Sequence, residues 1–456
     1  MRGQRAAVAC LSRGAAFASV LRLMQPLSNV LPPSAATTAD GHLSIGGCDL
    51  VALAEEHGTP LVVYDAGALR DTMQRYLQAF RAHDPHAEVI YASKAFWAQA
   101  VLRMVHEEDL RVDVASGGEL FMALHAGFPP QKIVMHGNAK DAKEINEALE
   151  ARVGLVVCDS LDEIGLLNRI AGERGVVQDV LIRVTPGVKP STHEYISTGQ
   201  LDSKFGLSLE GGLAAAAVAA CRAATNVNIV GLHCHIGSQI FEIGAYPVAA
   251  QLLAAFVKEV GREGLDIMDM GGGLGIAYGR ADDPPSVEAY ADTVMEAVFA
   301  EWDAAGLERP RVMVEPGRSI VGRAGVTVYR VTGTKDIPGV RRYVAVDGGM
   351  SDLMRPMLYG AVYEAILPER PEAEASEHVR LVGKHCESGD VLIKEIDLPH
   401  LEAGNLVCLP ATGAYGVAMA SNYNGVTRPA VVFVENGEAT VVVRRETYGE
   451  LVSRDA

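Results

Sequence analysis

The chain has 456 residues, of which 49% are hydrophobic and 21% charged, so it can bury a large core and lacks the composition of a disordered protein. At roughly 150 residues per domain it would hold two or three domains, although one barrel can span about 250 residues. Its 40 Lys and Arg residues against 57 Asp and Glu residues give a net charge of −17, which argues against nucleic acid or an anionic membrane as a partner.

Seven cysteines are scattered along the chain without forming a CxxC pair. This pattern argues against a disulfide framework and a four-cysteine zinc site, and it is typical of a reducing compartment. The sequence has no uncharged apolar run of about 18 residues, so we expect no membrane-spanning helix and a cytoplasmic protein.

The first forty residues differ from the rest, because they hold four arginines and no acidic residue before Asp40. That composition resembles a transit peptide, which leaves organellar targeting open, and a signal peptide is a weaker alternative. A third explanation is that the translation start has been placed too early, since Met24 could be the initiating methionine instead. We expect residues 1–40 to be an unstructured or cleaved extension outside the fold.

From residue 60 onward, short β-branched runs alternate with longer stretches rich in Ala, Leu and Glu, which indicates βαβ units and a parallel sheet. Eight buried strands are predicted, at 88–92, 111–115, 132–135, 154–158, 180–184, 229–233, 267–270 and 312–314. Helices are predicted at 98–107, 119–125, 141–150, 161–173, 212–223, 246–263 and 287–305. This alternation favours a (β/α)8 barrel over residues 60–320. An open doubly wound sheet is the alternative, weakened because no G-x-G-x-x-G motif opens the first βα turn.

After residue 325 the runs become short, rich in β-formers and separated by Gly, Asp and Asn turns. They lie at 326–331, 343–346, 379–382, 406–409, 430–434 and 439–444. The pattern predicts a second, mostly antiparallel domain, a β-sandwich or β-barrel over residues 321–456. We include residues 41–59 in this domain, because GHLSIGGCD (41–49) also resembles strand and turn.

Catalytic residues of a barrel lie at the carboxyl ends of its strands. The segments that follow the predicted strands are SK (93–94), SGGE (116–119), HGN (136–138), DS (159–160), TPG (185–187), HIGS (235–238), GGG (271–273) and EPGR (315–318). Polar, cationic and glycine residues recur at all eight ends, which predicts a ligand site at the mouth of the barrel. The glycine run fits neither a Rossmann nor a Walker A motif, but its backbone could approach a phosphate.

Three of these side chains leave alternatives open. By position alone, Lys94 is a surface lysine more often than a nucleophile; if it points into the barrel mouth, desolvation would lower its pKa and favour a Schiff base. His233 and His235 could face the same side of one strand as an HxH metal pair. Because we find no third histidine or carboxylate at a matching strand end, we expect no metal and a core or ring-stacking histidine.

Two polar clusters stand between strands of the second domain, CESGD (386–390) and GAYG (413–416). Either can be an ordinary turn. The acidic neighbours Glu387 and Asp390 should raise the thiol pKa of Cys386, which suits a proton donor better than a thiolate nucleophile.

Ten motifs, in order along residues 42–455, resemble those of the diaminopimelate decarboxylases, pyridoxal 5′-phosphate (PLP) enzymes of the alanine-racemase-like fold type. They are YASKAF (91–96), DVASGGEL (113–120), HGNAK (136–140), TGQLDSKFGLS (198–208), HCHIGSQI (233–240), GGGLGIAYG (271–279), EPGRSIVG (315–322), DGGMSDLMRPMLYGA (347–361), CESGDVL (386–392) and GAYGVAMASNYN (413–424). Ten ordered motifs are far more specific than any one of them.

The resemblance implies roles for residues around the cofactor. Lys94 would hold PLP as an internal aldimine, His235 would stack on the pyridine ring, and Glu315 would keep the pyridine nitrogen protonated. The phosphate would lie among Ser238, Gly272, Gly273 and the backbone of Glu315, Pro316, Gly317 and Arg318.

The resemblance also implies how substrate binds. The distal carboxylate of meso-diaminopimelate would be held by Arg318, Arg355 and Tyr359, and the distal ammonium by Glu387; Tyr415 would contact both cofactor and substrate. Decarboxylation through an external aldimine and quinonoid, with protonation by Cys386, would yield L-lysine and CO2. In the family the CESGD loop comes from a second subunit, so a homodimer with shared active sites is implied.

Related activities remain as alternatives. PLP decarboxylases of ornithine, arginine or carboxynorspermidine share the lysine, GGG and EPGR motifs, whereas GSQI, CESGD and RPMLYGA favour diaminopimelate. A non-catalytic homologue is a second alternative, and retention of both Lys94 and Cys386 argues against it. A metal-dependent amidohydrolase is a distant third.

Overall fold

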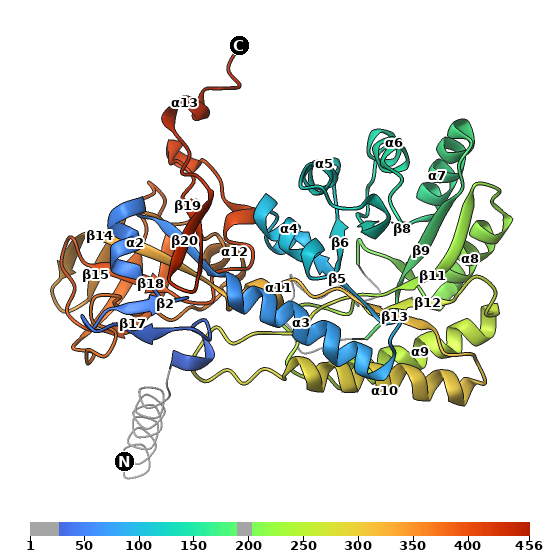
Figure 1. The fold of residues 1–456 in the computed structure, drawn as a ribbon, viewed down its shortest axis with the longest axis horizontal. Helices are drawn as coiled ribbons and strands as arrows, with labels where there is room; N and C mark the ends of the chain where they lie inside the picture. The colour runs from blue at the N-terminus through green and yellow to red at the C-terminus, as the bar shows by residue number, and fades with distance from the viewer. Residues whose placement is uncertain (1–26, 189–202) are drawn as a thin grey trace, which may run out of the picture.

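The computed structural model describes residues 27–188 and 203–456, and its larger part is a closed parallel barrel (Figure 1). Eight strands form a ring in the order β5, β6, β7, β8, β9, β11, β12, β13, closed by pairing of β8 with β9 and of β13 with β5. They are β5 (Glu88–Ala92), β6 (Arg111–Val114), β7 (Ile133–Met135), β8 (Leu155–Cys158), β9 (Gln178–Thr185), β11 (Val227–His233), β12 (Ile267–Asp269) and β13 (Arg311–Val314). The predicted barrel is confirmed, and each predicted strand end lies within two residues of the observed one.

Apolar side chains from successive strands fill the inside of the barrel, so it is a packed core and not a pore. The layer is made of Ile90, Val134, Leu155, Val157, Leu181, Ile267 and Met313. A short strand, β10 (Leu207–Ser208), extends the sheet beyond β9. Part of the motif at 198–208 falls on residues 198–202, which lie outside the described residues.

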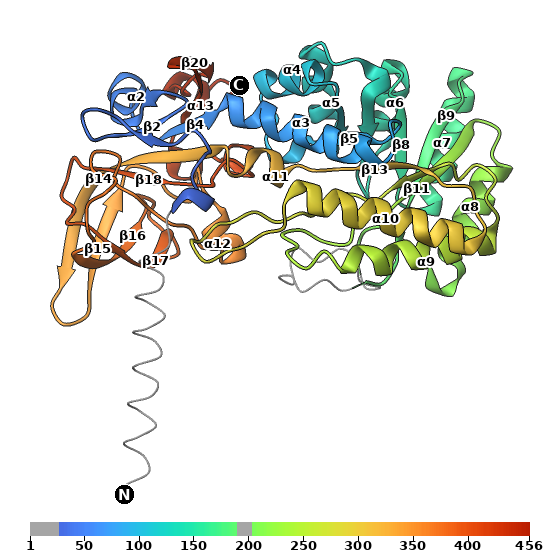
Figure 2. The same ribbon diagram turned by 60° about the horizontal axis from the view of Figure 1, so that its bottom comes forward.

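The helices that follow these strands match the predicted ones. They are α4 (Gln99–Glu107), α5 (Gly117–His125), α6 (Ala142–Ala151), α7 (Leu161–Arg174), α8 (Leu213–Ala223), α9 (Ala245–Val260) and α10 (Val287–Ala305). The sequence analysis missed α3 (Ala66–His83), which precedes the first barrel strand and lies alongside α10 (Figure 2). Its buried Leu69, Met73, Tyr76 and Phe80 recur at helical spacing, so the signal was present in the sequence.

The second domain is a mixed, mostly antiparallel β sheet, as predicted. Its strands are β4 (Leu61–Asp65), β14 (Gly325–Ile337), β15 (Arg341–Val346), β16 (Glu377–Val382), β17 (Val391–Leu398), β18 (Leu406–Leu409), β19 (Ala430–Glu435) and β20 (Glu438–Val443). The order is β17-β16-β15-β14-β4-β19-β20, with β18 also paired to β14. The pairs β15–β16 and β4–β19 are parallel. β17 had not been predicted.

One strand differs from its expected place. We expected residues 61–65 in the barrel, but β4 is hydrogen-bonded between β14 and β19 of the β domain. All five of its residues are buried, which suits a central strand covered on both faces. Residues 61–65 are therefore part of the β domain, because their hydrogen-bonding partners come from the C-terminal part of the sequence.

The N-terminal part of the described chain packs on this sheet. β1 (Ala36–Thr37), β2 (Leu43–Ile45) and β3 (Cys48–Asp49) form a small sheet followed by α2 (Leu50–His57). Leu43 and Ile45 share one apolar cluster with Val326 and Val432. The segment at 41–49 thus shares an apolar cluster with strands of the later domain.

Residues 27–40 are also part of the fold, so our expectation of an unstructured extension up to residue 40 is wrong for them. A short 3-10 helix, η1 (Leu27–Asn29), leads into Val30, which is fully buried. The Arg323 guanidinium donates a hydrogen bond to the Leu31 carbonyl at 2.8 Å. Burial of Val30 and this hydrogen bond to the Leu31 backbone fix the segment against the rest of the fold. Residues 1–26 lie outside the described residues.

Throughout the described part of the chain, we find no helix with the length and apolar character needed to span a bilayer.

Candidate active site

A cavity of about 720 Å³ lies where the carboxyl ends of the barrel strands meet loops of the β domain. Ten of the residues assigned roles from the sequence line it, namely Lys94, His235, Ser238, Gly273, Glu315, Gly317, Arg318, Arg355, Tyr359 and Tyr415. Gly272 and Pro316 adjoin lining residues without being part of the lining, and Cys386 and Glu387 do not line it. The volume is in the range of small-molecule and cofactor sites.

Lys94 lies in η2 (Ser93–Ala95), the turn directly after β5, and its side chain faces the cavity. Asp113, near the end of β6, also lines the cavity and accepts a hydrogen bond from the Ser93 backbone N–H at 2.9 Å. Burial by itself would lower the pKa of Lys94, but the negative charge of Asp113 and that of Glu315 outweigh it, so the pKa is raised. Our expectation of a lowered Lys94 pKa is therefore wrong, because the lysine is flanked by carboxylates.

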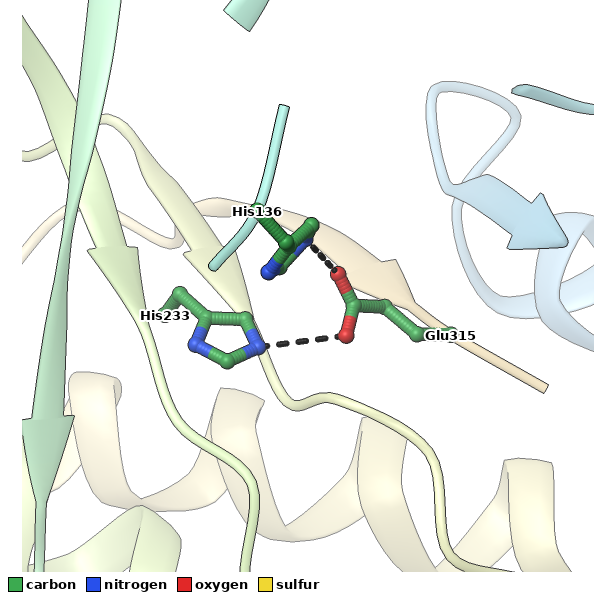
Figure 3. A group of neighbouring side chains, drawn as sticks. All are labelled: His136, His233 and Glu315. Carbon is green, nitrogen blue, oxygen red and sulfur yellow. Dashed lines mark hydrogen bonds and ion pairs between the residues drawn. The ribbon is translucent and has the colours of Figure 1, made fainter. Parts of the chain in front are cut away.

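Glu315, directly after β13, lies between two imidazoles (Figure 3). Its Oε1 is 2.6 Å from Nε2 of His136, and its Oε2 is 3.1 Å from Nε2 of His233. The three come from different strands, so we were wrong to expect no carboxylate or third histidine to join His233. His235, the other half of the supposed metal pair, is not part of this group.

The group of His136, His233 and Glu315 has the donor types of a metal site. Metal–ligand bonds are about 2.0–2.2 Å, so ligand atoms that share one ion lie roughly 3 Å or more apart. Nε2 of His136 and Oε1 of Glu315 are only 2.6 Å apart, so the two side chains contact each other directly and leave no room for a shared ion between these atoms. We therefore interpret the group as an anchored carboxylate and not as a metal centre.

Burial would raise the pKa of Glu315, but the adjacent His136 and His233 imidazoles outweigh this and hold the pKa well below its usual value. The carboxylate is thus ionised although only 6% of its surface is exposed. Burial lowers the pKa of His233 to about 4. At neutral pH His233 is therefore an uncharged N–H donor that holds the carboxylate without cancelling its charge.

His235 presents an uncharged ring to the cavity. The Gly272 backbone N–H donates a hydrogen bond to its Nδ1 at 3.2 Å, which fixes the ring orientation. Burial, reinforced by the positive charges of Lys94 and Arg183, lowers the pKa of His235 well below its usual value. A neutral, flat ring held in this way can stack on an aromatic ligand.

Two glycines at one side of the cavity pack too closely against neighbouring backbone to be replaced by residues with side chains. A Cβ at Gly272 would lie 2.1 Å from the Glu315 carbonyl oxygen, and one at Gly273, where φ is +122°, would lie 2.5 Å from the Gly237 oxygen. Ser238, on the same wall, accepts a hydrogen bond from Nη2 of Arg318 at 2.9 Å. Bare backbone, a hydroxyl and a guanidinium are groups that suit a phosphate.

Two arginines flank one tyrosine at the end of the cavity nearer the β domain. Nη1 of Arg318 donates to the Tyr278 hydroxyl at 2.6 Å, and the Arg355 guanidinium lies 4.5 Å from the centre of the Tyr278 ring. Arg355 also donates to the Tyr363 hydroxyl at 2.5 Å. Tyr415 lies against the other face of this cluster, with its ring centre 4.9 Å from the Arg318 guanidinium. Among the residues that the structure describes, neither of these buried cations is bonded to a carboxylate, which suits an anionic ligand group.

The loop between β16 and β17 holds Cys386 and Glu387 at the surface, away from the cavity of their own chain. Its backbone is well anchored. The buried Asp390 carboxylate accepts N–H groups of Met350 at 2.8 Å and His385 at 2.9 Å. The loop backbone is therefore anchored, while the Cys386 and Glu387 side chains are exposed.

Several cavity residues carried no assigned role, among them the polar Asp113, His136, Arg183 and Tyr278. His136 was among the polar strand ends, and Asp113 and Tyr278 lie in the quoted motifs, so position gave a signal for these three. Arg183 lies within β9, where only knowledge of which face points into the barrel would have found it.

Comparison with known proteins gives first the class. The family described as "Pyridoxal-dependent decarboxylase, pyridoxal binding domain" matches residues 67–322, more than half of the chain. A lysine/ornithine decarboxylase from Vibrio vulnificus, 24% identical with a TM-score of 0.71, shares the fold. The chain is thus a PLP-dependent decarboxylase by class.

The particular family follows from nearer relatives. Diaminopimelate decarboxylase of Bacillus subtilis is 47% identical over 91% of this chain and 95% of its own length, and that of Mycobacterium bovis is 45% identical over 94% and 98%. The structure of diaminopimelate decarboxylase from M. jannaschii is 35% identical, with a TM-score of 0.87 over 93% of this chain and 98% of that one. The chain belongs to the diaminopimelate decarboxylase family.

Proposed function

We propose that the protein decarboxylates meso-2,6-diaminopimelate to L-lysine and CO2, the last step of lysine biosynthesis, with PLP in the cavity. The observation that carries the proposal is the arrangement along one cavity of a lysine, an ionised buried carboxylate and two buried arginines. When bound, PLP supplies the electron sink that accepts the electron pair left on the α-carbon as CO2 departs.

The residues at one end of the cavity fit the cofactor. Lys94 would bind it covalently, and Glu315 would pair with the pyridine nitrogen. His235 would stack on the ring, in the orientation that Gly272 fixes. Ser238, Gly273 and Gly317, together with the adjoining Gly272 and Pro316, would surround the phosphate, where the wall admits no side chain.

The residues at the other end fit the substrate. Diaminopimelate carries an ammonium and a carboxylate at each end, so its distal end needs both cations and an anion. Arg318, Arg355 and Tyr359 would bind the distal carboxylate, and Tyr415 would contact cofactor and substrate. Arg318 and Arg355 are both buried, which strengthens such charge-assisted bonds.

We also propose that the enzyme is a homodimer in which each cavity is completed by the partner's loop. Cys386, as the proton donor, and Glu387, as the anion for the distal ammonium, stand exposed on an anchored loop, outside their own cavity. Two apolar side chains at or beside the cavity mouth, Leu358 (49% exposed) and Val362 (60% exposed), would be covered by the same association. No cysteine is among the described residues that line the cavity.

A CO2-release assay tests the proposal. Purified protein with added PLP is offered meso-diaminopimelate, L-ornithine, L-arginine and L-lysine in parallel, and Lys94→Ala is the matched control. We expect release from meso-diaminopimelate alone, and a loss of roughly 10³-fold or more in the variant. Release from another amino acid would overturn the substrate assignment of Arg318 and Arg355, and no release from any would favour a non-catalytic homologue.

A further inference from the structure

The carboxylate proposed to face the pyridine nitrogen has an unusual surrounding, because both of its oxygens are held by histidines. His136 contacts Oε1 and His233 contacts Oε2, and their rings meet edge to face, with centres 5.0 Å apart (Figure 3). A single contact would leave the carboxylate free to rotate. Two contacts from two different strands fix both its position and its plane.

Each imidazole is itself held in place. His136 donates its backbone N–H to the Val114 carbonyl at 2.7 Å. The next residue, Gly137, is tied down by Lys140, whose ammonium contacts the Gly137 and Val157 carbonyls at 2.6 and 2.8 Å. The Lys140 ammonium also forms an ion pair with Glu163 at 2.6 Å, so three oxygen atoms surround it.

His233 is the last residue of β11, and among the described residues its Nδ1 has no hydrogen-bond partner. A buried N–H without an acceptor is costly, so the proton belongs on Nε2, where Glu315 accepts it. His233 is thereby an oriented donor, and its ring cannot turn without losing this bond.

We infer that His136 and His233 are positioning residues that fix the Glu315 carboxylate toward the pyridine nitrogen of the cofactor. This inference rests on the proposed function, in which Glu315 keeps that nitrogen protonated. The ring accepts electrons best when its nitrogen is protonated, so the two histidines act on the rate through Glu315 and not by touching substrate. Outer partners of a functional group typically change activity by about 10- to 100-fold.

The test reads the pyridine nitrogen directly, by ¹⁵N NMR of enzyme loaded with ¹⁵N-labelled PLP. Glu315→Gln serves as the reference for a nitrogen that has lost its carboxylate. We expect His136→Leu and His233→Leu to move the ¹⁵N resonance toward the Glu315→Gln value, with kcat reduced about tenfold or more and KM little changed. The Gln variants, whose side-chain N–H reaches about as far as Nε2, should stay near wild type.

Further variants separate this role from a general effect on packing. If a Leu variant does not fold, the smaller polar Asn carries the same test, because its side chain is too short to reach Glu315. Tyr246→Phe is the matched control: it removes a buried hydrogen bond of 2.8 Å to the Gly272 carbonyl and should leave the ¹⁵N resonance unchanged. A wild-type resonance in the Leu and Asn variants, while Glu315→Gln moves it, would overturn the inference. Wild-type enzyme that binds no PLP, or an unmoved Glu315→Gln, would instead contradict the proposed function.

Discussion

In the barrel, the Glu315 carboxylate is buried and contacts two imidazoles. In the β domain, by contrast, Cys386 and Glu387 are exposed at the surface of the same chain. Both regions are rigidly built: Lys140 and its acceptors hold the first, and Asp390 holds the second. The difference is that Glu315 has its partners within the chain, whereas Cys386 and Glu387, in our proposal, meet theirs in a second subunit. A well-anchored loop with outward reactive side chains is what a shared active site requires.

The largest effect is expected when the two regions are inactivated by substitutions in different chains. Cys386→Ala should lose about 10²- to 10⁴-fold of the CO2-release rate, since it removes the proposed proton donor. When Cys386→Ala is unfolded and refolded with an equal amount of Lys94→Ala, random pairing puts one intact site in half of the dimers. We expect recovery to about a quarter of the wild-type rate. A mixture no more active than its separate components would contradict the shared site.

Breaking the buried ion pair between Lys140 and Glu163 should have the next largest effect, and this effect is on stability. Lys140→Met leaves Glu163 as a buried charge without its partner and should lower the free energy of unfolding by about 3–5 kcal/mol, measured by urea denaturation. The double variant Lys140→Met, Glu163→Leu should lose less, because no unpaired charge remains. Equal stability of the single variant and the wild type would show that the pair does not anchor this loop.

A smaller effect is expected where the barrel meets the β domain. Tyr278→Phe removes the hydroxyl that accepts a hydrogen bond from Arg318 but keeps the ring beside Arg355. We expect KM for meso-diaminopimelate to rise about tenfold with kcat nearly unchanged, because the distal carboxylate lies far from the reacting carbon. Tyr343→Phe, in β15, is the matched control. A fall in kcat at constant KM would place Tyr278 in the chemistry instead.

The smallest effect concerns the rim of the cavity. The Asn29 side-chain amide lies 3.2, 2.9 and 3.1 Å from the carbonyl oxygens of Gly279, Arg280 and Asp282, in the loop that carries Tyr278. Asn29→Ala should lower the free energy of unfolding by about 1–2 kcal/mol, and should raise KM only severalfold. Ser28→Ala, one residue away, should change neither quantity. An effect of equal size in both variants would mean that the segment acts by packing alone.

Local patterns predicted the barrel well, because buried parallel strands are short apolar runs whatever their neighbours are. Strands of the β domain were harder: β4 pairs with segments from the far end of the chain, and nothing near residue 61 indicates that. The resemblance supplied most of the residues that line the cavity. It did not reveal that His136 and His233 meet at Glu315, because that contact depends on how three strands are staggered around the barrel.

The exposure of Cys386 could not be predicted from composition or spacing either. CESGD is equally compatible with a turn that faces its own barrel and with one that faces another molecule. Only the anchoring of Asp390 beneath the loop, seen in three dimensions, fixes the direction of its side chains.

The position of β4 has a consequence for how the protein is made. This strand leaves the ribosome before any barrel strand, yet its two neighbours in the sheet, β14 and β19, are synthesised only after the barrel is complete. The barrel can therefore fold during translation while an apolar strand at its N-terminal side waits unpaired. Slow translation of the last third of the chain would prolong this wait, so newborn chains would depend most on chaperones during that interval.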